Sequence, residues 1–114
     1  MDSKILVTLR MIVRPERRPD LLETIRGMLE PARVERGCLS YRLYEDVENI
    51  NAFVLLEEWA TQEDLERHIS KDNQRRLLAL MDLLSEQPEL RFNTVSHTAG
   101  MDLMENVLKT DGPR

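Results

Sequence analysis

The most informative segment of this sequence lies near its start and reads Ile5-Leu-Val-Thr-Leu-Arg-Met-Ile-Val13. Its odd-numbered positions are all apolar, whereas its even-numbered positions mix apolar and polar residues, and this period of two is typical of a β-strand. A strand that is apolar on one side and half apolar on the other is covered on both faces. We therefore expect residues 4–13 to form a strand between a layer of helices and a second protein surface.

The next segment has the spacing of an amphipathic helix over about residues 19–35. Its apolar side chains recur three or four residues apart, as Leu21 and Ile25 illustrate. Pro31 is expected to kink or break the last turn, because proline lacks the backbone N–H that continues a helix. Gly37 is expected to stop the helix, since glycine is common just past a helix C-terminus.

The rest of the chain continues the alternation of strand and helix. Strands at 38–47 and 52–59 are separated by the turn-prone residues Glu-Asn-Ile-Asn, which predicts an antiparallel hairpin. Further elements are expected as a helix after Thr61, a helix at about 73–84, a strand over 90–96 and a short amphipathic helix at 100–109.

Two acidic or hydroxyl residues are placed to begin the paired helices in the middle of the chain. Thr61 precedes one helix and has Asp64 at its third position, a variant of the capping box. Asp72 is placed to cap the next helix.

This order of elements predicts an α+β fold on the ferredoxin-like plan. The plan consists of a four-stranded antiparallel sheet with helices on one face, and here one of the helices is split in two. We expect a domain over residues 1–98, followed by a C-terminal amphipathic helix and tail over residues 99–114. Because the open face of the sheet is partly apolar, a second copy of the chain is the simplest cover for it.

Composition excludes several classes of function. The 114 residues include 16 basic and 21 acidic side chains, a net charge of −5, whereas nucleic-acid binding needs clustered positive charge. No apolar run approaches the roughly 18 residues that span a bilayer. A single cysteine makes no internal disulfide. We therefore expect no nucleic-acid partner, no membrane association and a cytoplasmic location.

Neither a cofactor nor a metal ion is expected. The four glycines are not clustered, so no phosphate-binding loop for a nucleotide is present. Asp46, Glu57 and Glu58 are acidic neighbours on the hairpin strands, but no paired histidine or paired carboxylate spacing on a helix accompanies them.

Three segments together resemble one known family. They read Arg33-Val-Glu-Arg-Gly-Cys-Leu-Ser-Tyr-Arg-Leu-Tyr-Glu-Asp46, Phe53-Val-Leu-Leu-Glu-Glu-Trp59 and Leu65-Glu-Arg-His68. Their joint spacing resembles that of the antibiotic biosynthesis monooxygenase family, and the resemblance extends over about residues 5–96. It implies a small ferredoxin-like fold that dimerises sheet to sheet into an α/β barrel.

The resemblance also implies a range of activities. Members include oxygenases of polyketide anthrones and quinols that use neither metal nor flavin, some haem-degrading enzymes and many proteins without an assigned activity. We expect a cofactor-independent monooxygenase that oxidises a small aromatic, quinol- or anthrone-like substrate with dioxygen. The alternatives are a non-catalytic dimer that binds a small hydrophobic ligand or acts in stress responses, a haem-degrading monooxygenase and an isomerase of a small signal molecule. Haem degradation typically uses an asparagine on the first strand, where this chain offers Thr8 and Arg10.

Two residues are candidates for the chemistry itself. His68 falls on the apolar side of its helix, and the family pattern has a histidine at this place, facing a pocket. A histidine exchanges protons near neutral pH and can act as a base, although a purely structural histidine is the alternative. Trp59, the only tryptophan, offers an indole N–H donor and a flat wall for an aromatic substrate, or simply fills the core.

Four further residues are candidates for contact with the substrate. Tyr41 and Tyr44 point to opposite faces of their strand, and Tyr41 is favoured. The others are apolar residues of the following strand and helix, namely Phe53, Leu55 and Leu65. Cys38 is expected to pack rather than react, and His97 is expected to lie exposed in a loop.

Overall fold

The computed structural model describes residues 3–70 and 73–110, so the expected cap Asp72 lies outside the described residues. Within this range the chain forms four strands, four α-helices and a short 3-10 helix. In chain order they are β1 (Lys4–Ile12), η1 (Pro15–Arg17), α1 (Arg18–Arg33), β2 (Cys38–Asp46), β3 (Asn49–Trp59), α2 (Gln62–Ser70), α3 (Asn73–Met81), β4 (Glu89–Val95) and α4 (Met101–Thr110).

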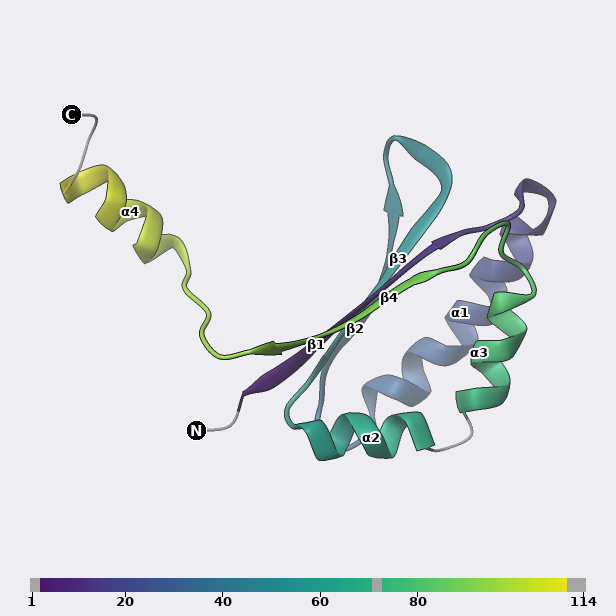
Figure 1. The fold of residues 1–114 in the computed structure, drawn as a ribbon, viewed down its shortest axis with the longest axis horizontal. Helices are drawn as coiled ribbons and strands as arrows, with labels where there is room; N and C mark the ends of the chain where they lie inside the picture. The colour runs from purple at the N-terminus through teal and green to yellow at the C-terminus, as the bar shows by residue number, and fades with distance from the viewer. Residues whose placement is uncertain (1–2, 71–72, 111–114) are drawn as a thin grey trace.

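The four strands form one antiparallel sheet in the order β2-β3-β1-β4. The central strand β1 pairs with β3 on one side and with β4 on the other, so that Val7 lies between Glu57 and Phe92. The helices α1, α2 and α3 all cover one face of this sheet (Figure 1). This arrangement confirms the expected ferredoxin-like α+β fold.

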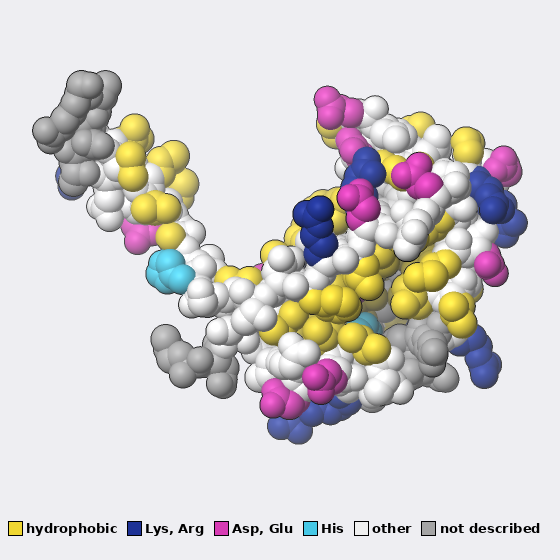
Figure 2. Space-filling view, in the orientation of Figure 1, with side chains coloured by type: hydrophobic (Ala, Val, Ile, Leu, Met, Phe, Trp, Pro, Cys, Tyr) yellow, Lys and Arg dark blue, Asp and Glu magenta, His cyan; other side chains and the backbone are white. Residues whose placement is uncertain are grey.

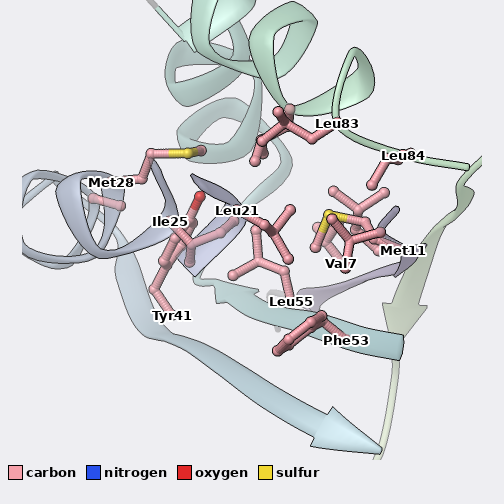
Figure 3. Packing of buried hydrophobic residues seen from close by; sticks show 14 of the residues in the cluster. Val7, Met11, Leu21, Ile25, Met28, Tyr41, Phe53, Leu55, Leu83 and Leu84 are labelled. Carbon is pink, nitrogen blue, oxygen red and sulfur yellow. The ribbon is translucent and has the colours of Figure 1, made fainter. Parts of the chain in front are cut away.

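The hydrophobic core lies between that face and the helices. Odd-numbered residues of β1 and β3 point into it, because alternate side chains of a strand share a face. Figure 3 shows Leu21, Ile25 and Met28 of α1 packed over Tyr41 and Leu55 of the sheet. The alternation in the sequence therefore identified the buried side of both central strands.

The end of α1 differs from the sequence-based expectation. The helix continues through Pro31 and ends at Arg33 rather than near residue 35, and Gly37 lies beyond it in the connection to β2. Gly37 has a φ of 83°, and a Cβ built on it would lie 2.1 Å from Oδ2 of Asp64. The glycine is needed for this left-handed turn and for the close approach of α2, not as the helix stop.

Other boundaries shift for identifiable reasons. Strand β3 already begins at Asn49, inside the expected turn, and a register shift near Glu45 and Asp46 accommodates the longer hairpin. Helix α3 ends at Met81 rather than near residue 84, because Leu84 forms a bridge with Val13 and draws the chain back to the sheet.

Helix α2 begins with the capping arrangement that the sequence predicted. The backbone N–H of Asp64 donates to Oγ1 of Thr61 over 3.1 Å, and the Thr61 hydroxyl donates to Oδ2 of Asp64 over 2.9 Å. Arg67, one turn later, forms an ion pair with the same carboxylate at 2.8 Å. Asp64 thus links the first turn of α2 to the connection that contains Gly37.

The opposite face of the sheet, called here the open face, is not covered by helices α1 to α3. Its centre consists of half-buried apolar residues of β1 and β3, namely Leu6, Ile12, Val54 and Leu56. Around them lie charged pairs such as Lys4 with Glu58, whose nitrogen and oxygen are 2.7 Å apart. Helix α4 stands away from the sheet, on the side opposite to α1–α3 (Figure 1). No helix among the described residues is long and apolar enough to cross a membrane.

Candidate functional site

A cavity of about 440 Å³ lies between the helix-covered face of the sheet and helices α2 and α3. Most of its walls are aliphatic or aromatic, and hydrophobic side chains gather across the middle of the face that carries β4 (Figure 2). The lining residues are Val7, Leu9, Met28, Tyr41, Leu55, Glu57, His68, Ile69, Ser70, Leu77, Leu80, Leu90 and Phe92. An apolar cavity with a few polar groups at one place is typical of a small-molecule site.

His68 reaches the cavity from α2 and lies between two carboxyl groups. Its Nδ1 is 3.0 Å from Oε2 of Glu35, and its Nε2 is 3.8 Å from Oε1 of Glu57. Because a carboxylate only accepts hydrogen bonds, Nδ1 donates to Glu35, and a neutral His68 then carries its lone pair on Nε2. The ring is therefore oriented with Nε2 toward Glu57, and both residues line the cavity.

Glu57 is a buried acid on the helix-covered face of β3. Its Oε1 accepts a hydrogen bond from Nε1 of Trp59 over 2.9 Å. Burial raises the pKa of Glu57, with a further contribution from the charge of Glu35, whereas the Trp59 hydrogen bond and the charge of His68 oppose the rise. Glu57 therefore holds its proton to a higher pH than an exposed glutamate does.

Two aromatic side chains enclose the His68 ring. The centroids of the Trp59 and His68 rings are 4.5 Å apart with a tilt of 31°, and those of Tyr41 and His68 are 5.8 Å apart in an edge-to-face arrangement. Burial, together with the charges of Glu57 and Glu35, raises the pKa of Tyr41, so its phenol stays protonated at neutral pH. The site thus brings together a base, a buried acid and a neutral hydroxyl donor.

Comparison with known proteins identifies the family of the chain. A sequence model described as "Antibiotic biosynthesis monooxygenase" matches residues 4–79, which is more than half of the chain. The chain belongs to the antibiotic biosynthesis monooxygenase family.

The relatives agree in fold and say little about substrate. An uncharacterized protein of Synechocystis sp. is 28% identical over 98 residues, covering 85% of this chain and 67% of its own length. A protein of Mycobacterium tuberculosis, named provisionally as a monooxygenase, is 35% identical over 68 residues, covering 60% of this chain and 66% of its own length.

Solved structures give the same result. The M. tuberculosis protein Rv0793 superimposes with a TM-score of 0.78 at 27% identity, covering 86% of this chain and all of that one. A conserved protein of Methanosarcina mazei superimposes with a TM-score of 0.79 at 25% identity, covering 82% of this chain and 94% of that one.

The structure brings some of the expected site residues to the cavity and leaves others behind it. His68, Tyr41 and Leu55 line the cavity, whereas Tyr44 is exposed on the open face of the sheet. Trp59 is fully buried behind the lining, and its N–H is directed to Glu57 rather than into the cavity. Two further expected contacts, Phe53 and Leu65, are likewise buried without being among the described lining residues.

Sequence reasoning missed both carboxyl groups of the site. Glu57 has the same parity as Phe53, Leu55 and Trp59, so the alternation that assigned those residues to one face could have found it. Glu35 lies in the irregular connection after α1 and meets His68 across 33 positions of sequence, and no local pattern marks it.

The described residues offer little to hold a metal ion. Among them, no group of three or more histidine, cysteine, aspartate or glutamate side chains is placed to bind one. Cys38 packs at the edge of the core, and burial raises the pKa of its thiol, as do the charges of Glu57 and Glu35. It therefore lacks the lowered pKa of a reactive cysteine.

Proposed function

We propose that this member of the antibiotic biosynthesis monooxygenase family is a cofactor-independent oxygenase of a small aromatic hydroxyl compound. The observation that carries the proposal is the orientation of His68, whose Nδ1 is held by Glu35 while its Nε2 lies 3.8 Å from Oε1 of Glu57, at the wall of an apolar cavity that His68 and Glu57 both line. An oriented imidazole with one nitrogen bound to a carboxylate is the arrangement of a general base. Family membership supports the reaction class.

The reaction asks the protein to remove a proton and to keep out water. An electron-rich quinol loses its hydroxyl proton to Nε2 of His68, and the resulting anion passes one electron to dioxygen. The substrate radical and superoxide then join through a new C–O bond. Loss of water leaves one oxygen atom in the hydroxyquinone product and the other in the water, so that the substrate supplies all the electrons. The same balance converts an anthrone methylene group to a carbonyl group and water.

The groups around His68 and the cavity walls have tasks in this scheme. Glu35 keeps the His68 ring in one orientation and stabilises the imidazolium that forms. Tyr41, which stays neutral, can donate a hydrogen bond to the oxygen on which negative charge develops. The aliphatic walls hold the aromatic ring and exclude bulk water.

Oxygen-electrode assays with quinols and anthrones test the base. His68→Ala should lower kcat by about 10²–10⁴-fold, because a general base acts in the transition state, with a smaller change in substrate binding. His97→Ala, at an exposed position outside the site, is the matched control and should keep the wild-type rate.

Equal rates for the wild type and His68→Ala would remove the catalytic role. Binding of quinols without oxygen uptake would instead favour a non-catalytic ligand-binding protein. A Soret band that appears on titration with haem would favour the haem-degrading alternative, which the resemblance to the family also allows.

We further propose that two copies of the chain pack through the open face of the sheet. The apolar residues at its centre, Leu6, Ile12, Val54 and Leu56, are only half covered within one chain. An interface of this kind buries on the order of 2,000 Å² in total. Light scattering should give a dimer at micromolar concentration, and a monomer would contradict the proposal. A cytoplasmic location fits the single cysteine, Cys38, which makes no internal disulfide.

Helix α4 is proposed to pack on the same second copy. Its apolar residues are all exposed in one chain, namely Met101, Leu103, Met104, Val107 and Leu108. The helix projects on the side of the open face, where a second copy would lie (Figure 1). Ending the chain at Gly100 should therefore weaken the dimer, measured as a higher dissociation constant in dilution experiments. An unchanged constant would show that α4 packs elsewhere.

A further inference from the structure

The His68 end of the cavity has two acidic groups close to it. The imidazole of His68 lies between the carboxyl groups of Glu35, 3.0 Å from its Nδ1, and Glu57, 3.8 Å from its Nε2. Of these two acids, Glu57 lines the cavity. Glu57 and His68 are only 7% and 6% exposed, so solvent screens charges at this end of the cavity weakly.

The basic side chains that the structure describes near the cavity are engaged with other groups or exposed. None of the described lining residues is a lysine or an arginine. Arg33 donates to the backbone oxygen of Tyr41 and to Glu30, and Arg67 forms an ion pair with Asp64. The charge of Arg76 makes the smallest of the contributions to the pKa of Tyr41, and the side chain of Arg76 is exposed.

We infer that this cavity selects its substrate by charge, taking neutral aromatic hydroxyl compounds and excluding those with a ring carboxylate or another anionic group, with Glu57 as the determinant. This inference rests on the proposed site and names its substrate class. A neutral hydroxyl can donate a hydrogen bond to the Glu57 carboxylate or to Nε2 of His68. An anionic substituent would lose its hydration among aliphatic walls and gain no cation from the described lining residues, beside a carboxyl group of its own sign.

Anaerobic calorimetry tests the inference, since no turnover occurs without dioxygen. The probes are naphthohydroquinone, dihydroxynaphthoate, which differs from it by one carboxylate, and the methyl ester of that acid, which keeps the added bulk without the charge. The wild type should bind the quinol and the ester at least about tenfold more tightly than the acid, because only the acid places a negative charge beside the carboxyl groups. Poor binding of the ester as well would show that bulk, not charge, is excluded.

Substitutions assign the effect to one residue. Glu57→Gln keeps the side-chain shape and an oxygen for the Trp59 N–H, and should reduce the preference over the acid to less than about threefold. Glu58→Gln, on the opposite face of the same strand, is the matched control and should keep the full preference. If Glu57→Gln fails to fold by circular dichroism, Glu35→Gln removes the other carboxylate and should reduce the preference in the same way.

Three results would overturn the inference. They are equal binding of quinol and acid to the wild type, an unchanged preference in the folded variants, and no binding of any of the three probes. Failure of the proposed oxygenase gives a different result, namely the expected preference in calorimetry with no oxygen uptake when air is admitted.

Discussion

Replacing Trp59 by phenylalanine tests whether the indole acts mainly through Glu57. The indole ring packs against His68 with centroids 4.5 Å apart, and its N–H donates to Oε1 of Glu57 over 2.9 Å. Phenylalanine keeps an aromatic ring in the same place and removes the donor. The buried carboxylate of Glu57 then loses its hydrogen-bond partner in the part of the chain that the structure describes.

The expected loss can be worked out from these contacts. A hydrogen bond to a charged group contributes about 1.5–3 kcal/mol. The smaller ring also leaves unfilled space in the core, which costs about 1 kcal/mol. Trp59→Phe should therefore lower the free energy of unfolding by about 2–4 kcal/mol at a pH where Glu57 is ionised.

The loss should also depend on pH, in a direction that the pKa of Glu57 fixes. Burial raises this pKa in the folded protein, so the stability contributed by the group falls as the pH rises from its unfolded pKa to its folded pKa. The Trp59 hydrogen bond opposes the rise, and its removal raises the folded pKa further. The effect of Trp59→Phe should thus be larger at about pH 8 than at about pH 5.

Urea unfolding followed by far-ultraviolet circular dichroism measures this, because the substitution removes the only tryptophan. The protein concentration must be the same throughout, since a dimer unfolds in a concentration-dependent way. A double-mutant cycle with Glu57→Gln isolates the part of this hydrogen bond that depends on the charge of Glu57, because the amide oxygen still accepts from the indole, and should give a coupling energy of about 1 kcal/mol. A loss below about 1 kcal/mol, or one that is equal at both pH values, would refute the assigned role of the indole N–H.

Three further predictions follow from the same structure. Gly37→Ala should lower the free energy of unfolding by about 2–3 kcal/mol, since it strains a left-handed residue and displaces the capping Asp64. The control Gly27→Ala adds a Cβ that meets nothing within 4 Å, and it should stabilise the protein by up to about 1 kcal/mol in the same urea assay. Thr61→Ala should cost about 1 kcal/mol through loss of the α2 cap, and Thr61→Ser should restore most of it; equal stabilities would contradict the cap. Glu57→Gln should flatten the fall of stability between about pH 5 and pH 8, and an unchanged slope would show that another group causes it.

Much of the fold could be predicted from the sequence because strand period and helix period are local properties. The alternation over Ile5–Val13 gives the buried face of β1, and the same parity rule separates Tyr41 from Tyr44. The spacing of Leu65 and His68 likewise places the histidine on the buried side of α2, where the structure has it. These inferences need no knowledge of which elements lie next to each other.

The polar partners of His68 could not be found in this way. Glu35 reaches it from an irregular connection, and only the packing of α2 beside that connection brings the two together. Glu57 enters the sequence-based prediction only as a possible metal ligand beside Asp46 and Glu58, and the lack of a paired spacing leaves it without a site role there. The break expected at Pro31 also does not occur, because Ala32 in the last turn of α1 is buried and Arg33 donates to the backbone oxygen of Tyr41.

Strand β3 divides two tasks between alternate residues. Leu55 lines the cavity and Glu57 supplies its acid, while Val54 and Leu56 on the other side belong to the open face. Insertion of a single residue in the middle of this strand would exchange the two sets beyond the insertion, destroying pocket and outer surface together. Substitution is free of that constraint. An engineer can change the odd-numbered residues of β3 to alter ligand choice and leave the even-numbered residues intact. In the same way, related proteins can change substrate during evolution while the outer surface of the sheet stays the same.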